Sequence, residues 1–180
     1  MSKYSITIVI LFLYSSVVAY GFHQVKPSEL TEGDLRFYTS INSDDEHSYH
    51  EVDSLIHSKS TEADSIIAKY AYFSDGALAE SMPILIDKAI RSRKGFVDNI
   101  SETKYFEGVV NHLYFFIIDE FSETDEAQCY DLNRFTQMIE KYLLEINGAI
   151  TDRESNLLRA SLWECHRYFT TDGNNNSSHK

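Results

Sequence analysis

Residues 105–121 read YFEGVVNHLYFFIIDEF and form the most apolar stretch of the chain after its N-terminal segment. Apolar residues recur in it at three- and four-residue spacing, and Tyr114, Phe115 and Ile118 fill much of the opposite face. This pattern predicts a helix that is buried nearly all round. The alternative is a strand over Leu113–Ile118, because Tyr, Phe and Ile favour strands. Helix is favoured, since the helical spacing begins before that run and no hairpin signal flanks it.

The composition is that of a globular protein. Of its 180 residues, 43% are hydrophobic and 13% aromatic, which is too apolar for a disordered protein. This length predicts one domain with a sizeable core. The formal net charge of −12 makes nucleic acids and anionic membranes unfavourable partners, because an acidic surface repels phosphates.

Residues 1–19 have the features of a secretory signal peptide. Lys3 gives a positive start, an apolar region follows over 6–18, and small residues end it at Ala19, with cleavage after Gly21 as an alternative. The competing interpretation is a signal anchor, but the apolar part is shorter than the roughly 20 residues that span a bilayer. We therefore expect a secreted, extracellular protein with no membrane span in the mature chain.

The rest of the sequence divides into three parts. Residues 22–60 are polar and predict only short helices, with the acidic patch Ser43–Glu46 as a solvated loop between them. Repeated helical spacing predicts a helical domain over 61–170. The polar tail 171–180 should be disordered, because it has nothing to bury.

Within the helical domain, the central helix is expected at about 102–120, and two amphipathic helices follow it. Thr151 and Glu154 form a capping box that opens the last helix, and a short link around 148–150 joins it to the one before. Helices joined by so short a link fold back on each other. The sequence therefore predicts an all-α protein, a compact bundle of roughly five or six helices around the central helix with a C-terminal antiparallel helical hairpin.

The two cysteines, Cys129 and Cys165, are expected to form a disulfide. A secreted protein enters an oxidising compartment, where thiols pair. Cys129 lies about twenty residues before the hairpin link and Cys165 about fifteen after it, so at about 1.5 Å per residue both sit at the same end of the hairpin. In a cytosolic protein the same residues would be interpreted as buried thiols.

Three asparagines fit the N-glycosylation sequon, since Asn99, Asn175 and Asn176 are each followed two residues later by serine. Asn99 falls in an expected link between helices, and the other two fall in the tail. For a secreted protein these sites predict a glycoprotein.

Histidines are the main candidates for chemistry. His47, His50 and His57 lie among acidic residues, which are the residue types of a zinc or copper site, but their spacing matches no recognised ligand pattern. His112 lies in the apolar central stretch, where it is either a general base or a hydrogen-bonded core residue, and no Ser, Cys or Asp stands at a motif spacing to serve with it. Because other catalytic motifs are also missing, we expect no enzymatic activity, cofactor or metal.

The last helix brings together residue types that are frequent in binding hot spots. Arg159, Trp163 and Arg167 follow one another at four-residue spacing and form one stripe, with Tyr168 beside it. The stripe is either an interface for an extracellular protein or receptor, or a solvated flank on which Trp163 partly covers the core. The first interpretation predicts a non-enzymatic signalling or host-modulating protein, and the alternative function is a carrier that holds a small apolar ligand among aromatic helices.

The C-terminal pair of helices resembles, by analogy only, the last two helices of type I interferons and related helical cytokines. The resemblance uses Phe135, Ile139, Tyr142 and Leu143 in the first helix and Trp163, Glu164 and Arg167 in the second. It covers only this pair, the connection is longer than in that family, and the family's cysteine before the Trp-Glu pair is absent. What it implies is a secreted signalling protein that docks a receptor through a helical surface.

Overall fold

The computed structural model describes residues 30–121 and 131–175, and within them the polypeptide forms eight helices and no strand. The helices are α2 (Glu32–Ile41), α3 (Asp45–His57), α4 (Glu62–Phe73), α5 (Gly76–Ser92), α6 (Phe96–Ile100), α7 (Phe106–Phe121), α8 (Leu132–Glu145) and α9 (Asp152–Asn175). The predicted all-α class is confirmed. The strand alternative for Leu113–Ile118 is wrong, because that run lies inside α7.

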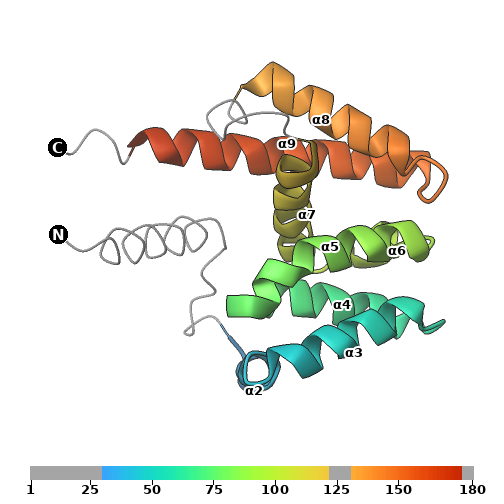
Figure 1. The fold of residues 1–180 in the computed structure, drawn as a ribbon, viewed down its shortest axis with the longest axis vertical. Helices are drawn as coiled ribbons and strands as arrows, with labels where there is room; N and C mark the ends of the chain where they lie inside the picture. Colours follow the sequence, from blue (N-terminus) through green and yellow to red (C-terminus); the bar gives the residue numbers. More distant parts are fainter. Residues whose placement is uncertain (1–29, 122–130, 176–180) are drawn as a thin grey trace, which may run out of the picture.

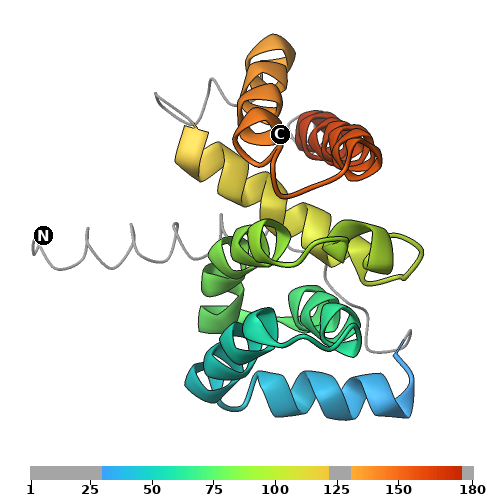
Figure 2. The same ribbon diagram turned by 90° about the vertical axis from the view of Figure 1, so that its right-hand side faces the viewer.

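Helix α7 lies between two groups of helices (Figure 1). It packs against α4 and α5 on the N-terminal side of the fold and against α8 and α9 on the C-terminal side, as the turned view also shows (Figure 2). Helices α8 and α9 lie side by side and run in opposite directions (Figure 1). The most apolar of the described helices therefore has neighbours on most of its faces.

Helices α2, α3 and α6 account for the difference from the expected number of five or six helices. Helices α2 and α3 occupy much of the polar segment 22–60, and α3 begins inside the acidic patch for which the sequence predicts a solvated loop. Helix α3 begins there because the Asp44 carboxylate accepts a hydrogen bond from the His47 N–H at 3.0 Å and so caps the start of the helix. The acidic residues that follow Asp44 complement the positive end of the helix dipole.

Helix α7 begins at Phe106, later than the predicted start near residue 102. Tight turns precede it, in which the Thr103 N–H donates to the Ile100 carbonyl and the Phe106 N–H to the Thr103 carbonyl. At the other end of the sequence, α9 continues to Asn175, inside the segment predicted as a disordered tail. The predicted signal peptide and residues 176–180 lie outside the described residues.

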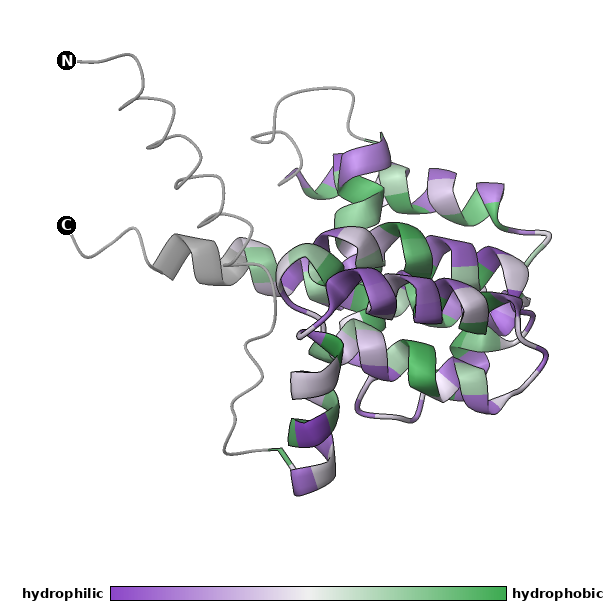
Figure 3. Ribbon diagram, turned by 60° about the horizontal axis from the view of Figure 1, so that its bottom comes forward, coloured by the Kyte–Doolittle hydropathy of each residue, from purple (hydrophilic) through white to green (hydrophobic). Residues whose placement is uncertain are grey.

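The interior is filled by apolar side chains from every described helix. Each helix carries both hydrophobic and hydrophilic residues along its length, so that one face can turn inward (Figure 3). None of the described helices is long and apolar enough to cross a membrane. The largest fully buried side chains are Tyr142, Phe73, Phe96, Phe135, Ile67, Leu78, Met82, Leu85, Ile86, Ile90, Ile100 and Leu113.

Helices α4 and α7 approach each other closely at Gly108. A Cβ atom at this position would lie 2.5 Å from Cα and 2.7 Å from N of Tyr72, and backbone atoms cannot move aside cheaply. The missing side chain of glycine is therefore what lets the two helices meet at this distance.

Glu154 caps two helices with one fully buried carboxylate. Its Oε2 accepts from the Thr151 N–H at 2.9 Å, and the Thr151 hydroxyl accepts from the Glu154 N–H at 3.2 Å, which confirms the predicted capping box. Its Oε1 accepts from the N–H groups of Val97 and Asp98, at 3.1 and 3.3 Å, which are the first-turn donors of α6. The starts of α6 and α9 are thereby held together.

Arg93 connects the N-terminal helices. Its guanidinium pairs with the buried carboxylate of Asp64 in α4. It also donates to the carbonyls of Leu55 at 2.9 Å and Ser60 at 2.6 Å, so that it satisfies backbone groups at and beyond the end of α3. Asn99 of α6 donates to the second Asp64 oxygen at 2.7 Å.

Candidate functional site

The predicted stripe Arg159, Trp163 and Arg167 lies on consecutive turns of α9, beside α8. Trp163 is half-buried and packs against the hydrophobic core, whereas Arg167 is exposed and pairs with Glu164 one turn earlier. Tyr168 extends the exposed part of this surface, with 62% of its area accessible. We call Arg159, Trp163, Arg167 and Tyr168 the α9 surface.

Arg159 differs from Arg167 because its head group is fixed between two helices. Its Nε and Nη2 donate to the two carboxylate oxygens of Glu140 in α8, at 2.6 and 3.0 Å, and its Nη1 donates to Asn156 Oδ1 at 2.9 Å. The hydrogen bond from Arg159 lowers the pKa of Glu140, and the same bond raises the pKa of Arg159. Three of the five guanidinium N–H groups thus donate to described residues.

Glu140, which lies on α8 and holds Arg159 of the α9 surface, was not among the residues predicted from the sequence. A signal for it exists, because two antiparallel helices joined by a short link bring residues at similar distances from that link opposite each other. Glu140 lies five residues before the end of α8, and Arg159 lies seven residues after the start of α9.

The predicted disulfide involves a residue outside the described part of the protein, since Cys129 falls in the gap between 121 and 131. Among the described residues Cys165 has no disulfide partner, and its thiol donates to Asn111 Oδ1 at 3.3 Å. Burial raises the pKa of Cys165 to about 12, so the thiol is neutral at physiological pH. The pairing of Cys129 with Cys165 stays a prediction.

Of the three predicted glycosylation sites, only Asn99 has a described side chain. It lies in α6 rather than in a link, and its amide nitrogen, the atom to which a glycan would be attached, donates to the buried Asp64 carboxylate. Asn175 is the last residue of α9, and Asn176 lies outside the described residues. Glycosylation at all three stays a prediction.

The three N-terminal histidines lie on α3, where His47, His50 and His57 are exposed. Within the described ranges, no group of three or more His, Cys, Asp or Glu side chains is arranged to hold a metal ion.

His112 is fully buried in α7, and the structure gives it a neighbour that sequence spacing does not reveal. Its Nε2 lies 3.2 Å from the Ser74 hydroxyl and 3.0 Å from the Ala71 carbonyl. Because a carbonyl can only accept, Nε2 carries the proton and cannot take one from Ser74. The arrangement therefore links α4 to α7 through a hydrogen bond and is not that of a nucleophile with its general base.

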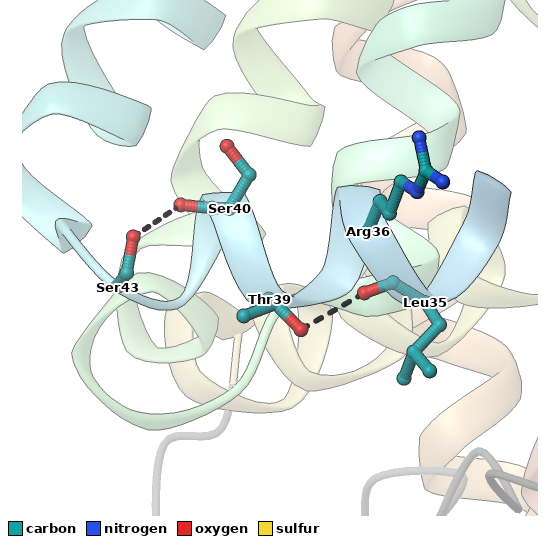
Figure 4. Close-up of a pocket in the computed structure, with 5 residues that line it drawn as sticks. All are labelled: Leu35, Arg36, Thr39, Ser40 and Ser43. Carbon is teal, nitrogen blue, oxygen red and sulfur yellow. Dashed lines mark hydrogen bonds between the residues drawn. The ribbon is translucent and has the colours of Figure 1, made fainter. Parts of the chain in front are cut away.

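An open depression of about 490 Å³ lies on the surface of α2 and is drawn in Figure 4. The residues that line it are all exposed, and two of its three hydroxyl groups bond to the backbone, since Thr39 donates to the Leu35 carbonyl at 2.9 Å and Ser43 to the Ser40 carbonyl at 2.8 Å. The hydroxyls of Thr39 and Ser43 are therefore turned to backbone carbonyls of α2 and not towards a common ligand position. The lining residues are Leu35, Arg36, Thr39, Ser40 and Ser43.

Comparisons with protein-family models, with curated proteins and with solved structures found no match to this protein.

Proposed function

We propose that this protein is a secreted, non-enzymatic binding protein that docks an extracellular protein or receptor through the α9 surface. The observation that carries the proposal is the fixed Arg159 head group beside Trp163 on the adjacent turn of α9. A side chain already held in place loses little conformational freedom on binding, and Trp and Arg are the residues that most often dominate binding energy.

The composition of the α9 surface favours a protein partner. Arg159 and Arg167 offer N–H donors suited to carboxylates, while Trp163 and Tyr168 offer apolar area with a polar edge. The net charge of the protein is −12, which disfavours phosphate-rich partners. The two arginines are therefore positive groups on a protein that is acidic as a whole. A partner with an acidic group next to an apolar pocket fits both features.

The alternative function, a carrier of a small apolar ligand, has less support. A carrier encloses most of its ligand in a concave pocket. The depression on α2 is open and lined by exposed residues, and the aromatic residues near α9 contact one another, as in the stacked pair Phe135 and His166 with centroids 4.2 Å apart.

The test is capture of extracellular proteins on the immobilised, purified protein, followed by a binding measurement with each captured protein. We expect the double variant Arg159→Ala with Arg167→Ala to weaken binding by about tenfold or more, whereas Ile84→Ala should leave it unchanged. Ile84 is a suitable control because it is 64% exposed and lies on α5.

Two further measurements distinguish the proposed interface from the carrier function. Glu140→Ala releases the Arg159 head group without removing it, so it should weaken binding less than Arg159→Ala does. Equal binding by the wild type and the double arginine variant would refute the proposed interface. Native mass spectrometry that finds a co-purifying lipid would favour the carrier instead.

A further inference from the structure

The link between α8 and α9 contains an asparagine followed by a glycine, Asn147 and Gly148, and both residues are exposed. They lie in a turn outside either helix, after α8 ends at Glu145. Asparagine is a thermolabile residue, because its side-chain amide can react with the next peptide nitrogen. Whether it reacts depends on access to that nitrogen and on the freedom of the backbone.

The local geometry leaves both reacting groups available. The Asn147 N–H bonds to the Leu144 carbonyl at 3.4 Å and the Ala149 N–H to the Ile146 carbonyl at 2.8 Å, whereas the Gly148 N–H between them has no acceptor among the described residues. The Asn147 carboxamide likewise makes no hydrogen bond to a described residue. A Cβ atom at Gly148 would meet no atom within 4 Å, so the space around the peptide nitrogen is open.

We infer that Asn147 is a site of spontaneous deamidation in the folded protein. The Gly148 nitrogen, losing its proton to solvent, attacks Cγ of Asn147 and forms a five-membered succinimide, while the bond between Cγ and the carboxamide nitrogen breaks and ammonia leaves. Water then opens the ring at either carbonyl and gives aspartate or isoaspartate. No oxidant, reductant or enzyme is needed, since water is the only co-reactant.

The other asparagines whose side chains the structure describes, and Asp75, lack this combination. Asn42 is half-buried, and its carboxamide donates to the Phe73 carbonyl at 2.9 Å and accepts from the Asp75 N–H at 3.0 Å. Asp75 also precedes a glycine, but its carboxylate accepts from the Tyr38 hydroxyl at 2.5 Å, and Gly76 begins α5. The remaining asparagines with described side chains lie within helices, where the following N–H is directed along the axis: Asn99, Asn111, Asn133 and Asn156.

The reaction changes the link in two ways. Aspartate adds a negative charge just beyond the C-terminus of α8, where the helix dipole is also negative and Glu145 already stands. Isoaspartate in addition inserts a methylene group into the backbone between the two helices of the hairpin. Ile146, at the start of this turn, is buried in the core. Both products are therefore expected to loosen the packing of the turn that joins α8 to α9.

The experiment uses the intact protein, incubated in mildly alkaline buffer and sampled by peptide mass spectrometry with fragmentation that separates aspartate from isoaspartate. Asn147 should convert faster than any other asparagine. Gly148→Ala should slow this conversion by about tenfold or more, because a Cβ restricts the backbone and hinders the attacking nitrogen. The φ of Gly148 is not positive, and its Cβ position is open, so this variant is expected to keep the fold.

A second comparison tests the contribution of the fold. In denaturant, Asn147 should react within about threefold of its native rate, because the folded link does not protect it, whereas Asn42 should react measurably only in the unfolded protein. Native Asn147 that stays intact while the denatured protein reacts would overturn the inference. So would equal rates for the wild type and Gly148→Ala.

Discussion

Glu140 and Arg159 form the clearest bridge between α8 and α9, with both carboxylate oxygens accepting from one guanidinium at 2.6 and 3.0 Å. The two side chains are 50% and 35% exposed, so water screens their attraction. In a double-mutant cycle with Glu140→Ala and Arg159→Ala, we expect a coupling of about 0.5–1 kcal/mol in the free energy of unfolding. Urea denaturation at low and high salt measures it, and the coupling should shrink as salt rises. A coupling of zero at low salt would contradict the observed bridge.

Gly108 should be intolerant of even a small side chain. Replacement by alanine improves intrinsic helix propensity by about 1 kcal/mol, but the new Cβ would overlap the Tyr72 backbone. We expect Gly108→Ala to lower the free energy of unfolding by about 1–3 kcal/mol. The matched control is Gly148→Ala, where the Cβ meets open space, and denaturant unfolding compares the two. Similar stability for both variants would show that α4 and α7 can separate without cost.

Buried histidines should make the fold sensitive to acid. Burial lowers the pKa of His112 to about 4 despite the bond to the Ala71 carbonyl, and burial also lowers the pKa of His166. Between the ordinary histidine pKa and these lower values, the unfolded protein binds more protons than the folded one. Stability is therefore full above about pH 6.5 and falls as the pH drops towards 4, by about 3 kcal/mol for His112.

The measurement is the free energy of unfolding at several pH values for the wild type and His112→Gln. Glutamine keeps an amide donor for the Ala71 carbonyl but does not titrate. The variant should lose a large part of the slope between pH 6.5 and 4. An unchanged slope would assign the acid sensitivity to other groups.

Arg93 is expected to be the most sensitive charged residue of the N-terminal helices. Its removal leaves the buried Asp64 carboxylate without its ion-pair partner and frees carbonyls near the end of α3. We expect Arg93→Ala to cost about 3–5 kcal/mol, whereas the adjacent, exposed Lys94→Ala should be nearly neutral. Thermal unfolding followed by circular dichroism distinguishes the two, and equal melting temperatures would refute the role of Arg93.

Secreted material should contain the bond between Cys129 and Cys165. Thiol labelling of unfolded, unreduced protein is then expected to find no free thiol. Two labelled thiols per molecule would argue against both the disulfide and the secretory route, and would leave the Cys165 thiol with its hydrogen bond to Asn111.

Local patterns explain how much of the fold was predictable. Two predictions of helical structure are confirmed, one from the apolar spacing of 105–121 and one from the capping box of Thr151 and Glu154. Each rests on residues of a single helix or its first turn. Pro83 lies at a position where proline is unusual, in the interior of α5. Proline is typical of a first helical turn, yet α5 begins at Gly76 and passes through Pro83, because the burial of Leu78 and Met82 outweighs one lost backbone hydrogen bond.

The candidate site was predictable only in part, for a similar reason. Four-residue spacing correctly indicates that Arg159, Trp163 and Arg167 lie on successive turns. Glu140, which lies 19 positions from its partner Arg159, has only the indirect signal of the expected hairpin, in which residues at similar distances from the link lie opposite each other. Ser74, which lies 38 positions from its neighbour His112, has no signal in the sequence, so this contact becomes visible only once the packing of the helices is known.

The shared cap at Glu154 has a consequence for the order in which the protein matures during synthesis. The ribosome synthesises Val97 and Asp98 well before Glu154, which follows them by 57 and 56 residues. Until that carboxylate is made, the N–H groups of Val97 and Asp98 have only water to accept their hydrogen bonds. A nascent polypeptide halted before residue 151 should therefore expose these amides to rapid hydrogen exchange, and completion of α9 should protect them, so that a helix made later completes the capping of one made earlier.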